Sequence, residues 1–252
     1  MLADAHAHIS DYSEEGLSLA LGRAKAKGVE MVVGLGADVE TSRRTVSLAK
    51  GRPMVYAAVG FHPWFLKGPF TDRDLEDIRA LAKEEKVSFI GEIGLDINRN
   101  ADRFEEQKRI FAQHLDLAKE LDLPINVHCR GADRELLELM ERQGMPRRGG
   151  VAHSYSGGAQ LLQAYLDLGF YISIGRGGLR IDPETEKVVK AVPPERLLLE
   201  TDSSAASSRQ ENAYEPASVS IIAENVARVR GVSPGELGDV TTANLKKLMR
   251  IQ

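Results

Sequence analysis

Two histidines stand one residue apart near the start of the chain, in the segment DAHAH at positions 4–8. In an extended strand alternate side chains point to the same face, so His6 and His8 would project together, with Asp4 behind them. Two imidazoles on one face are ready ligands for a divalent cation. Taken alone, however, two histidines at this spacing are as often ordinary core or surface residues as metal ligands.

Four further residues of the same chemical kind end later segments that have the composition of strands. They are Glu92 in FIGEIGLD, His128 in INVHCR, His153 in GVAHSYSG and Asp202 in LLLETD. Glu92 could be a buried carboxylate that backbone donors satisfy, but without a partner it would be costly in so apolar a strand. The repetition favours the interpretation that the fold gathers all these residues at one place.

Strand-like and helix-like segments alternate along the whole chain. Short apolar runs lie at 2–6, 29–35, 54–61, 87–93, 124–128, 150–153, 170–174 and 197–201. Amphipathic stretches lie at 14–27, 39–50, 72–85, 103–121, 134–143, 159–168, 183–191, 215–230 and 234–250. Such strand–helix units imply parallel strands, and eight of them predict an α/β fold of the (β/α)8 TIM-barrel type. We expect a single domain over residues 1–252, with a doubly wound open sheet as the alternative.

The barrel interpretation also predicts where the chemistry lies. Catalytic residues of such barrels stand at the carboxyl ends of the strands. Five of the six histidines end or directly follow a predicted strand, and only His114 falls within a predicted helix. Random placement would scatter them over helices and loops.

The composition limits the class of protein. A hydrophobic content of 42% and a charged content of 28% are ordinary for a globular protein. A net charge of −4 argues against a protein that coats DNA non-specifically, although an acidic body can carry a locally basic site. The single cysteine fits a reducing compartment, and we see neither a signal segment nor a membrane span. We therefore expect a cytoplasmic protein.

The motifs taken together resemble the TatD family of metal-dependent hydrolases, which includes TatD-like deoxyribonucleases. The resemblance runs from Asp4 to the final helix through DAHAH (4–8), VGFHPW (59–64), GEIGLD (91–96), FEEQKRIFAQHLDLAKELDLPINVHCR (104–130), HSYSGG (153–158), RLLLETD (196–202) and NLKKLM (244–249). It implies a (β/α)8 barrel whose site is related to that of the amidohydrolases.

The resemblance further implies two divalent metal ions. The expected ligands are His6, His8 and Asp202 for the first ion, His128 and His153 for the second, and Glu92 for both. A carboxylate can bridge because it has two oxygens, whereas an imidazole offers one lone pair. Two such ions can share a water molecule, and Asp202 is the expected general base that activates it, with Glu92 as its catalytic partner. The identity of the metal, whether zinc, manganese or magnesium, stays open.

Two residues are expected to bind the anionic part of a substrate. Arg130 offers a forked set of donors that matches phosphate oxygens, and His62 lies in the rim motif VGFHPW. A salt bridge for Arg130 and a packed ring for His62 are the alternatives. The single tryptophan, Trp64, could stack on a base or anchor its loop.

Other residues near the expected ligands have supporting roles. Asp4 and Asp96 are expected to orient ligands. Strand alternation directs Cys129 outward, which predicts a structural thiol and not a nucleophile. Ser156 and the two glycines after it open a helix, where free amides could accept a phosphate or the serine could act as an ordinary cap.

The chain departs from the family pattern at the rim. Segment 175–182 carries Arg176 and Arg180 where the family has a phenylalanine–lysine pair, and segment 203–216 is longer and more polar. These changes leave hydrolysis as the expectation but put the substrate in doubt. We expect a phosphodiesterase, most simply a 3′ exonuclease-type deoxyribonuclease on single-stranded DNA or RNA. An amidohydrolase-type enzyme for an amide, cyclic amide or ester is the first alternative, and a non-catalytic metal-stabilised protein is the second. The oligomeric state is not predicted.

Overall fold

The computed structural model describes residues 1–66, 68–205 and 214–251. Within them, one parallel sheet has neighbouring strands in the order β8-β7-β6-β5-β4-β3-β2-β1-β9. The strands are β1 (Leu2–His8), β2 (Val29–Leu35), β3 (Val55–Val59), β4 (Val87–Asp96), β5 (Ile125–Arg130), β6 (Gly150–Ala152), β7 (Phe170–Ile174), β8 (Leu197–Leu199) and β9 (Ser203–Ser204).

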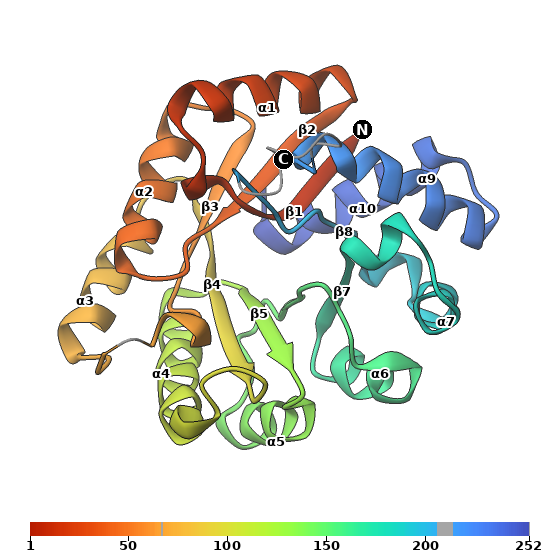
Figure 1. Cartoon of the computed structure of the whole chain (residues 1–252). Coiled ribbons are helices and arrows are strands. Elements are labelled where there is room, and N and C mark those ends of the chain that lie inside the picture. Colours follow the sequence, from red (N-terminus) through yellow and green to blue (C-terminus); the bar gives the residue numbers. More distant parts are fainter. Residues whose placement is uncertain (67, 206–213, 252) are drawn as a thin grey trace.

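Helices alternate with these strands and surround the curved sheet (Figure 1). They are α1 (Glu14–Ala26), α2 (Val39–Lys50), α3 (Asp72–Leu81), α4 (Phe104–Leu121), α5 (Asp133–Gln143), α6 (Gly158–Asp167), α7 (Pro183–Ala191), α9 (Val219–Arg230) and α10 (Pro234–Met249). Local signals set several starts: Asp38 accepts from the Thr41 backbone N–H in a capping box at α2, and Ser233 caps α10 before Pro234. In the part of the chain that the structure describes, no helix combines the length and the apolar character needed to cross a membrane.

The sheet closes on itself where the chain after β8 returns to β1. The Thr201 backbone N–H donates to Asp4 Oδ1 at 2.8 Å, and the Asp202 N–H donates to the His6 carbonyl oxygen at 2.8 Å. Ser203 of β9 then pairs with Ala7. The predicted single-domain (β/α)8 barrel is confirmed, and the short β9, which the sequence pattern did not predict, is the strand that completes it.

The two faces of the strands bury different cores. Outward residues such as Val127, Ile172 and Leu199 pack with the surrounding helices in one large cluster. Inward residues such as Met31, Phe89 and Tyr171 form a second cluster with the last turns of α10. Because α10 packs against these inward residues and its Asp239 pairs with the Met1 amino group at 2.8 Å, this helix covers the amino ends of the strands. The carboxyl ends are left for the site.

Some boundaries differ from the expected ones. The predicted strand at 54–61 is shorter and ends at Val59, ahead of a single 3-10 turn, η2 (Pro63–Phe65). The predicted strand at 87–93 is longer and includes Asp96. The predicted helix at 72–85 ends at Leu81.

His114 is the histidine that lies away from the strand ends, within α4. It is buried, its Nδ1–H donates to the Ile110 carbonyl at 2.8 Å, and its ring packs against Phe70. Burial lowers the pKa of His114 to about 4. The folded protein therefore holds this ring neutral at pH values at which an unfolded chain would protonate it.

We predict that His114 makes the protein less stable in mild acid. Between pH 6.5 and pH 4 the unfolded chain binds a proton that the folded protein does not, so stability falls as the pH falls. From pH 7 to pH 4.5 the loss from this group is about 2 kcal/mol. Urea unfolding of the chelator-treated protein should show a pH dependence smaller by that amount in His114→Leu. The same pH dependence in both proteins would contradict the assignment.

Candidate metal centre

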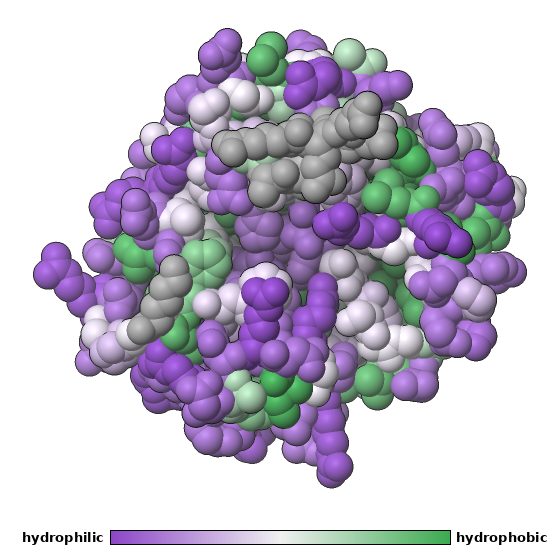
Figure 2. All heavy atoms as spheres, in the orientation of Figure 1, coloured by the Kyte–Doolittle hydropathy of each residue, from purple (hydrophilic) through white to green (hydrophobic). Residues whose placement is uncertain are grey.

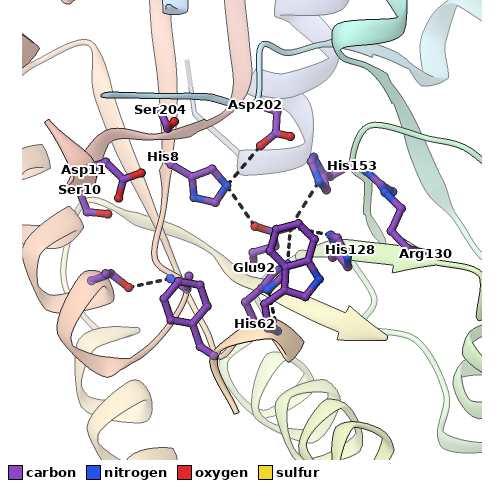
Figure 3. Close-up of a pocket in the computed structure, with 14 residues that line it drawn as sticks. His8, Ser10, Asp11, His62, Glu92, His128, Arg130, His153, Asp202 and Ser204 are labelled. Atoms are coloured by element: carbon purple, nitrogen blue, oxygen red, sulfur yellow. Dashed lines mark hydrogen bonds and ion pairs between the residues drawn. The ribbon is translucent and has the colours of Figure 1, made fainter. Parts of the chain in front are cut away.

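Glu92 stands at the carboxyl end of the barrel, and its Oε2 oxygen faces the residues from β1 and the end of β8 (Figure 3). This oxygen lies 3.4 Å from His6 Nε2 and 3.5 Å from His8 Nε2. Asp202 closes the group, with Oδ1 3.7 Å from His6 Nε2 and 3.3 Å from His8 Nε2. Two imidazoles and two carboxylates thus point at one another.

The other oxygen of Glu92, Oε1, faces a different set of rings. It lies 3.2 Å from His62 Nε2, 3.2 Å from His128 Nδ1 and 3.3 Å from His153 Nε2. The two oxygens therefore serve separate groups of nitrogen atoms. A carboxylate that bridged two cations would need this arrangement.

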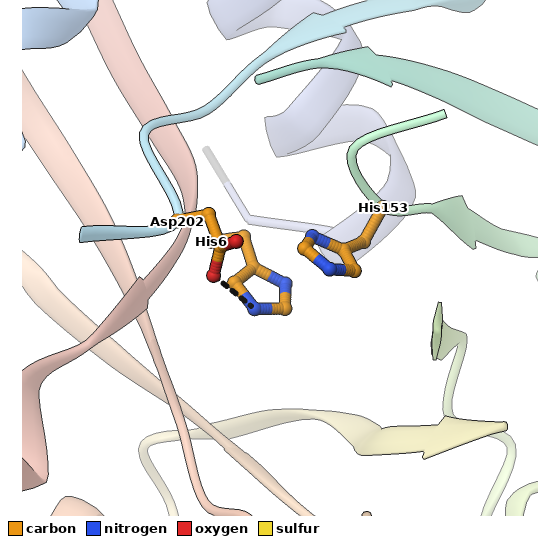
Figure 4. Close-up of side chains that lie close together, drawn as sticks. All are labelled: His6, His153 and Asp202. Carbon is orange, nitrogen blue, oxygen red and sulfur yellow. Dashed lines mark ion pairs between the residues drawn. The ribbon is translucent and has the colours of Figure 1, made fainter. Parts of the chain in front are cut away.

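Three sets of potential ligand atoms lie within 4.8 Å of one another: His6, His153 and Asp202; His6, His8 and Glu92; and His62, Glu92 and His128. Figure 4 shows the first set, in which the rings of His6 and His153 stack with their centres 3.8 Å apart. The structure thus brings together all six residues for which the sequence predicted a ligand role, and it adds His62 to their immediate surroundings.

Buried acceptors hold the far nitrogen of three of these rings. The acceptors are Asn126 Oδ1 for His6 Nδ1 at 3.0 Å, Glu200 Oε1 for His153 Nδ1 at 2.7 Å and Asp96 Oδ2 for His128 Nε2 at 2.9 Å. In the neutral form of each ring we assign the proton to the nitrogen that faces the acceptor, which leaves a lone pair on the nitrogen that faces Glu92. His6 Nε2 is buried and accepts no hydrogen bond from the described residues. These rings are set to bind a cation, so the donor set fits the metal ions that the family resemblance implies.

His62 has the opposite arrangement. Its Nδ1 accepts the backbone N–H of Trp64 at 3.1 Å, and burial lowers the pKa of the ring to about 4. A neutral ring whose Nδ1 is an acceptor carries its proton on Nε2, which faces Glu92. In this tautomer His62 offers an N–H to an oxygen atom and no lone pair to a cation.

Charge inside the cluster keeps its carboxylates ionised. Burial acts to raise the pKa of Glu92, but the surrounding histidines outweigh it and hold the pKa well below the usual range. Burial likewise opposes ionisation of Asp202, and the hydrogen bond from His8 lowers its pKa below the usual value. The effect on the histidines is the reverse: burial acts to lower the pKa of His6, but the charge of Glu92 outweighs burial and raises this pKa to about 10. The protein groups alone therefore gather positive charge around two carboxylates.

A pocket of about 340 Å³ opens over the cluster. Arg130 lines it, and one guanidinium nitrogen of Arg130 donates to the Cys129 carbonyl at 2.7 Å. Trp64 forms another wall: its indole N–H donates to Asp96, and the Arg99 guanidinium stacks on its ring at 4.0 Å. Trp64 thus ties its own loop to the end of β4 and is still 40% exposed.

The supporting residues include two that the sequence analysis missed, Asn126 and Glu200. Each stands two positions before a strand-end residue, at His128 and Asp202, and period-2 alternation alone could have indicated that they face inward. Asp96 holds His128 as predicted.

The remaining sequence predictions concern a thiol and two segments of the rim. Cys129 points outward into the core, and burial raises its pKa to about 12, which fits the predicted structural thiol. Arg176 stacks over Tyr214 at 5.0 Å, and neither Arg176 nor Arg180 is among the described residues that line the pocket. Residues 206–213 of the divergent segment 203–216 lie outside the described residues.

Comparison with known proteins places this site in a family. The model of the TatD-related DNase family matches residues 3–250. The chain is 33% identical to an uncharacterized metal-dependent hydrolase, YabD, of Bacillus subtilis, over 100% of both proteins. It is 34% identical, over 91% of each protein, to the 3′-5′ ssDNA/RNA exonuclease TatD of Salmonella typhimurium.

Solved structures agree with the sequence comparisons. YjjV, a TatD homolog from Escherichia coli K12, superposes with a TM-score of 0.90 at 28% identity, covering 100% of this chain and 98% of that one. A 5-methylcytosine deaminase from Klebsiella pneumoniae, at 13% identity and a TM-score of 0.61, shares the fold. With the family model spanning almost every residue, the chain belongs to the TatD family and is a metal-dependent hydrolase that acts on ester bonds.

Proposed function

We propose that the protein is a phosphodiesterase that removes nucleotides from the 3′ end of single-stranded DNA or RNA, with two divalent cations at Glu92. The observation that carries this proposal is that each of the two oxygens of Glu92 faces its own set of histidine nitrogen atoms. The proposed ligands are His6, His8 and Asp202 for one ion, His128 and His153 for the other, and Glu92 for both.

The nitrogen-rich ligand set favours zinc or manganese over magnesium, which prefers oxygen ligands. Bound divalent cations would polarise a phosphoryl oxygen and lower the pKa of water. The protein's own groups would do the rest. Asp202 is 28% exposed in its side chain and faces the pocket, so its ionised carboxylate can accept the proton of the attacking water. Arg130 can donate to phosphate oxygens at the pocket wall. His62 lines the same pocket, with its Nε2–H directed at Glu92 Oε1 at 3.2 Å, where it can orient that carboxylate.

The choice of nucleic acid rests on chemistry and on a relative. The Salmonella relative is named as an exonuclease for single-stranded DNA and RNA. The pocket volume of about 340 Å³ is in the range of sites for small ligands and suits one nucleotide better than a duplex. We propose a cytoplasmic location, in keeping with the single buried thiol of Cys129.

We predict that the metal-loaded protein releases mononucleotides from single-stranded oligonucleotides. The protein stripped with chelator and reloaded with manganese, zinc or magnesium should differ in rate among the metals. Asp202→Asn should lower kcat by at least about 100-fold at saturating metal, because it removes the proton acceptor. Nucleotide release followed by chromatography checks both statements.

Two results would contradict this prediction. A wild-type protein that holds two ions per chain but cleaves no phosphodiester would refute the nuclease activity. Esters, amides and cyclic amides then test the amidohydrolase-type alternative at the same site. Equal rates in wild type and Asp202→Asn would remove Asp202 from the role of general base.

We also predict that Glu200 sets the affinity for the ion at His153. Glu200 is buried and accepts the far N–H of His153 at 2.7 Å, so its loss frees the ring to turn and to change tautomer. Glu200→Ala should weaken binding of one of the two ions by about 10–100-fold, as isothermal titration calorimetry can measure. Glu200→Gln keeps an acceptor and should retain most of the affinity. Glu195→Ala, which removes an exposed carboxylate elsewhere, serves as the matched control.

A further inference from the structure

The pocket over Glu92 has two walls of different charge. On one side stand Ser10, Asp11 and Ser204, next to His8, and on the other side stands Arg130, beyond His128 and His153 (Figure 3). Ser204 pairs in register with His8, so the first wall is continuous with β1. Asp11 ends the 3-10 turn η1 (Ile9–Asp11) and is exposed.

The surface on the side of Asp11 continues away from the pocket. Beyond Asp11 a second hollow of about 720 Å³ shares Ser10, Asp11 and Thr41 with the first. Its charged lining residues are three carboxylates and two guanidiniums: Asp11, Glu14, Glu40, Arg43 and Arg44. Arg44 donates to the Tyr12 carbonyl at 2.8 Å, and Glu14 is paired at 2.5 Å with Arg52, which is not among the lining residues. This side offers a polyanion no excess of positive charge. The space-filling view shows a hydrophilic, hollowed face at the mouth of the pocket (Figure 2).

The proposed reaction makes the two sides of the substrate unequal. Water attacks the last phosphorus, the bond to the O3′ of the preceding nucleotide breaks, and that O3′ takes up a proton. The shortened strand keeps one negative charge per nucleotide. The terminal nucleoside presents beyond the scissile phosphate only its base and its sugar hydroxyls, and these carry no charge.

We propose that Asp11 is a specificity residue that accepts the 3′-hydroxyl of the terminal nucleoside and excludes a 3′-phosphate. This inference rests on the proposed nuclease function and adds the orientation of the strand to it. The uncharged terminal nucleoside lies against Ser10 and Asp11, and the phosphates of the remaining strand lie on the side of Arg130. A carboxylate accepts a hydrogen bond from a hydroxyl, but it repels a phosphate held at the same position.

The test compares two single-stranded oligonucleotides of one sequence, labelled at the 5′ end, that carry either a 3′-hydroxyl or a 3′-phosphate. The wild type loaded with manganese should cleave the hydroxyl end at least about tenfold faster, because like charges oppose binding of the phosphate end. In Asp11→Asn the ratio of the two rates should fall toward one, mainly through faster cleavage of the phosphorylated end. Glu15→Gln removes an exposed carboxylate outside both hollows and should keep the wild-type ratio.

The outcomes separate this inference from the proposed function. If the wild type cleaves neither oligonucleotide, the nuclease function itself fails. If it cleaves both at equal rates, or if Asp11→Asn keeps the wild-type ratio, the nuclease function stands and the role of Asp11 is overturned. Thermal unfolding of each variant by circular dichroism, together with a second variant, Asp11→Ala, shows that a changed ratio does not come from misfolding.

Discussion

A carboxylate enclosed by histidines is the interaction on which the rest of this structure depends. Glu92 is 2% exposed, and burying an ionised carboxylate is costly unless opposite charge and hydrogen-bond donors surround it. Five imidazole nitrogens lie within 3.5 Å of its two oxygens. They come from four strand ends spread over residues 6–153, so no local structure could supply them. The closed ring of parallel strands delivers this set to one point.

The hydrogen bonds that close the barrel also position residues of the site. Asp4 accepts hydrogen bonds from the backbone and the hydroxyl of Thr201, and the next residue, Asp202, donates its backbone N–H to the carbonyl of His6. The bonds that join the last strand to the first therefore also place Asp202 beside His6 and His8. Asp202 adopts a left-handed backbone conformation with φ of +55°, which turns its side chain at the point where the strand path is interrupted before β9.

Residue type and period were sufficient to predict the barrel, whereas the features that depend on local geometry were missed. Eight alternating strand–helix units indicated the fold, and the carboxyl ends of its strands indicated the residues that meet at Glu92. Asn126 and Glu200 escaped notice because each lies inside an apolar segment and not at its end. The orientation of His62 could not be predicted, because it depends on the 3-10 turn that directs the Trp64 N–H to Nδ1.

The attraction between Glu92 and the histidines around it also makes this centre suited to bind a divalent cation. The attraction that raises the pKa of His6 to about 10 is exerted by Glu92, and a divalent cation between the two groups would satisfy it better than a proton. A divalent cation bound at His6 would displace the proton on the nitrogen that faces Glu92, while Asn126, Glu200 and Asp96 would keep the proton on the far nitrogen of His6, His153 and His128. The hydrogen bonds behind the rings thus decide which nitrogen gives up its proton. Metal binding would therefore be coupled to proton release, and the residues behind the rings would determine which nitrogen atoms are available to the metal.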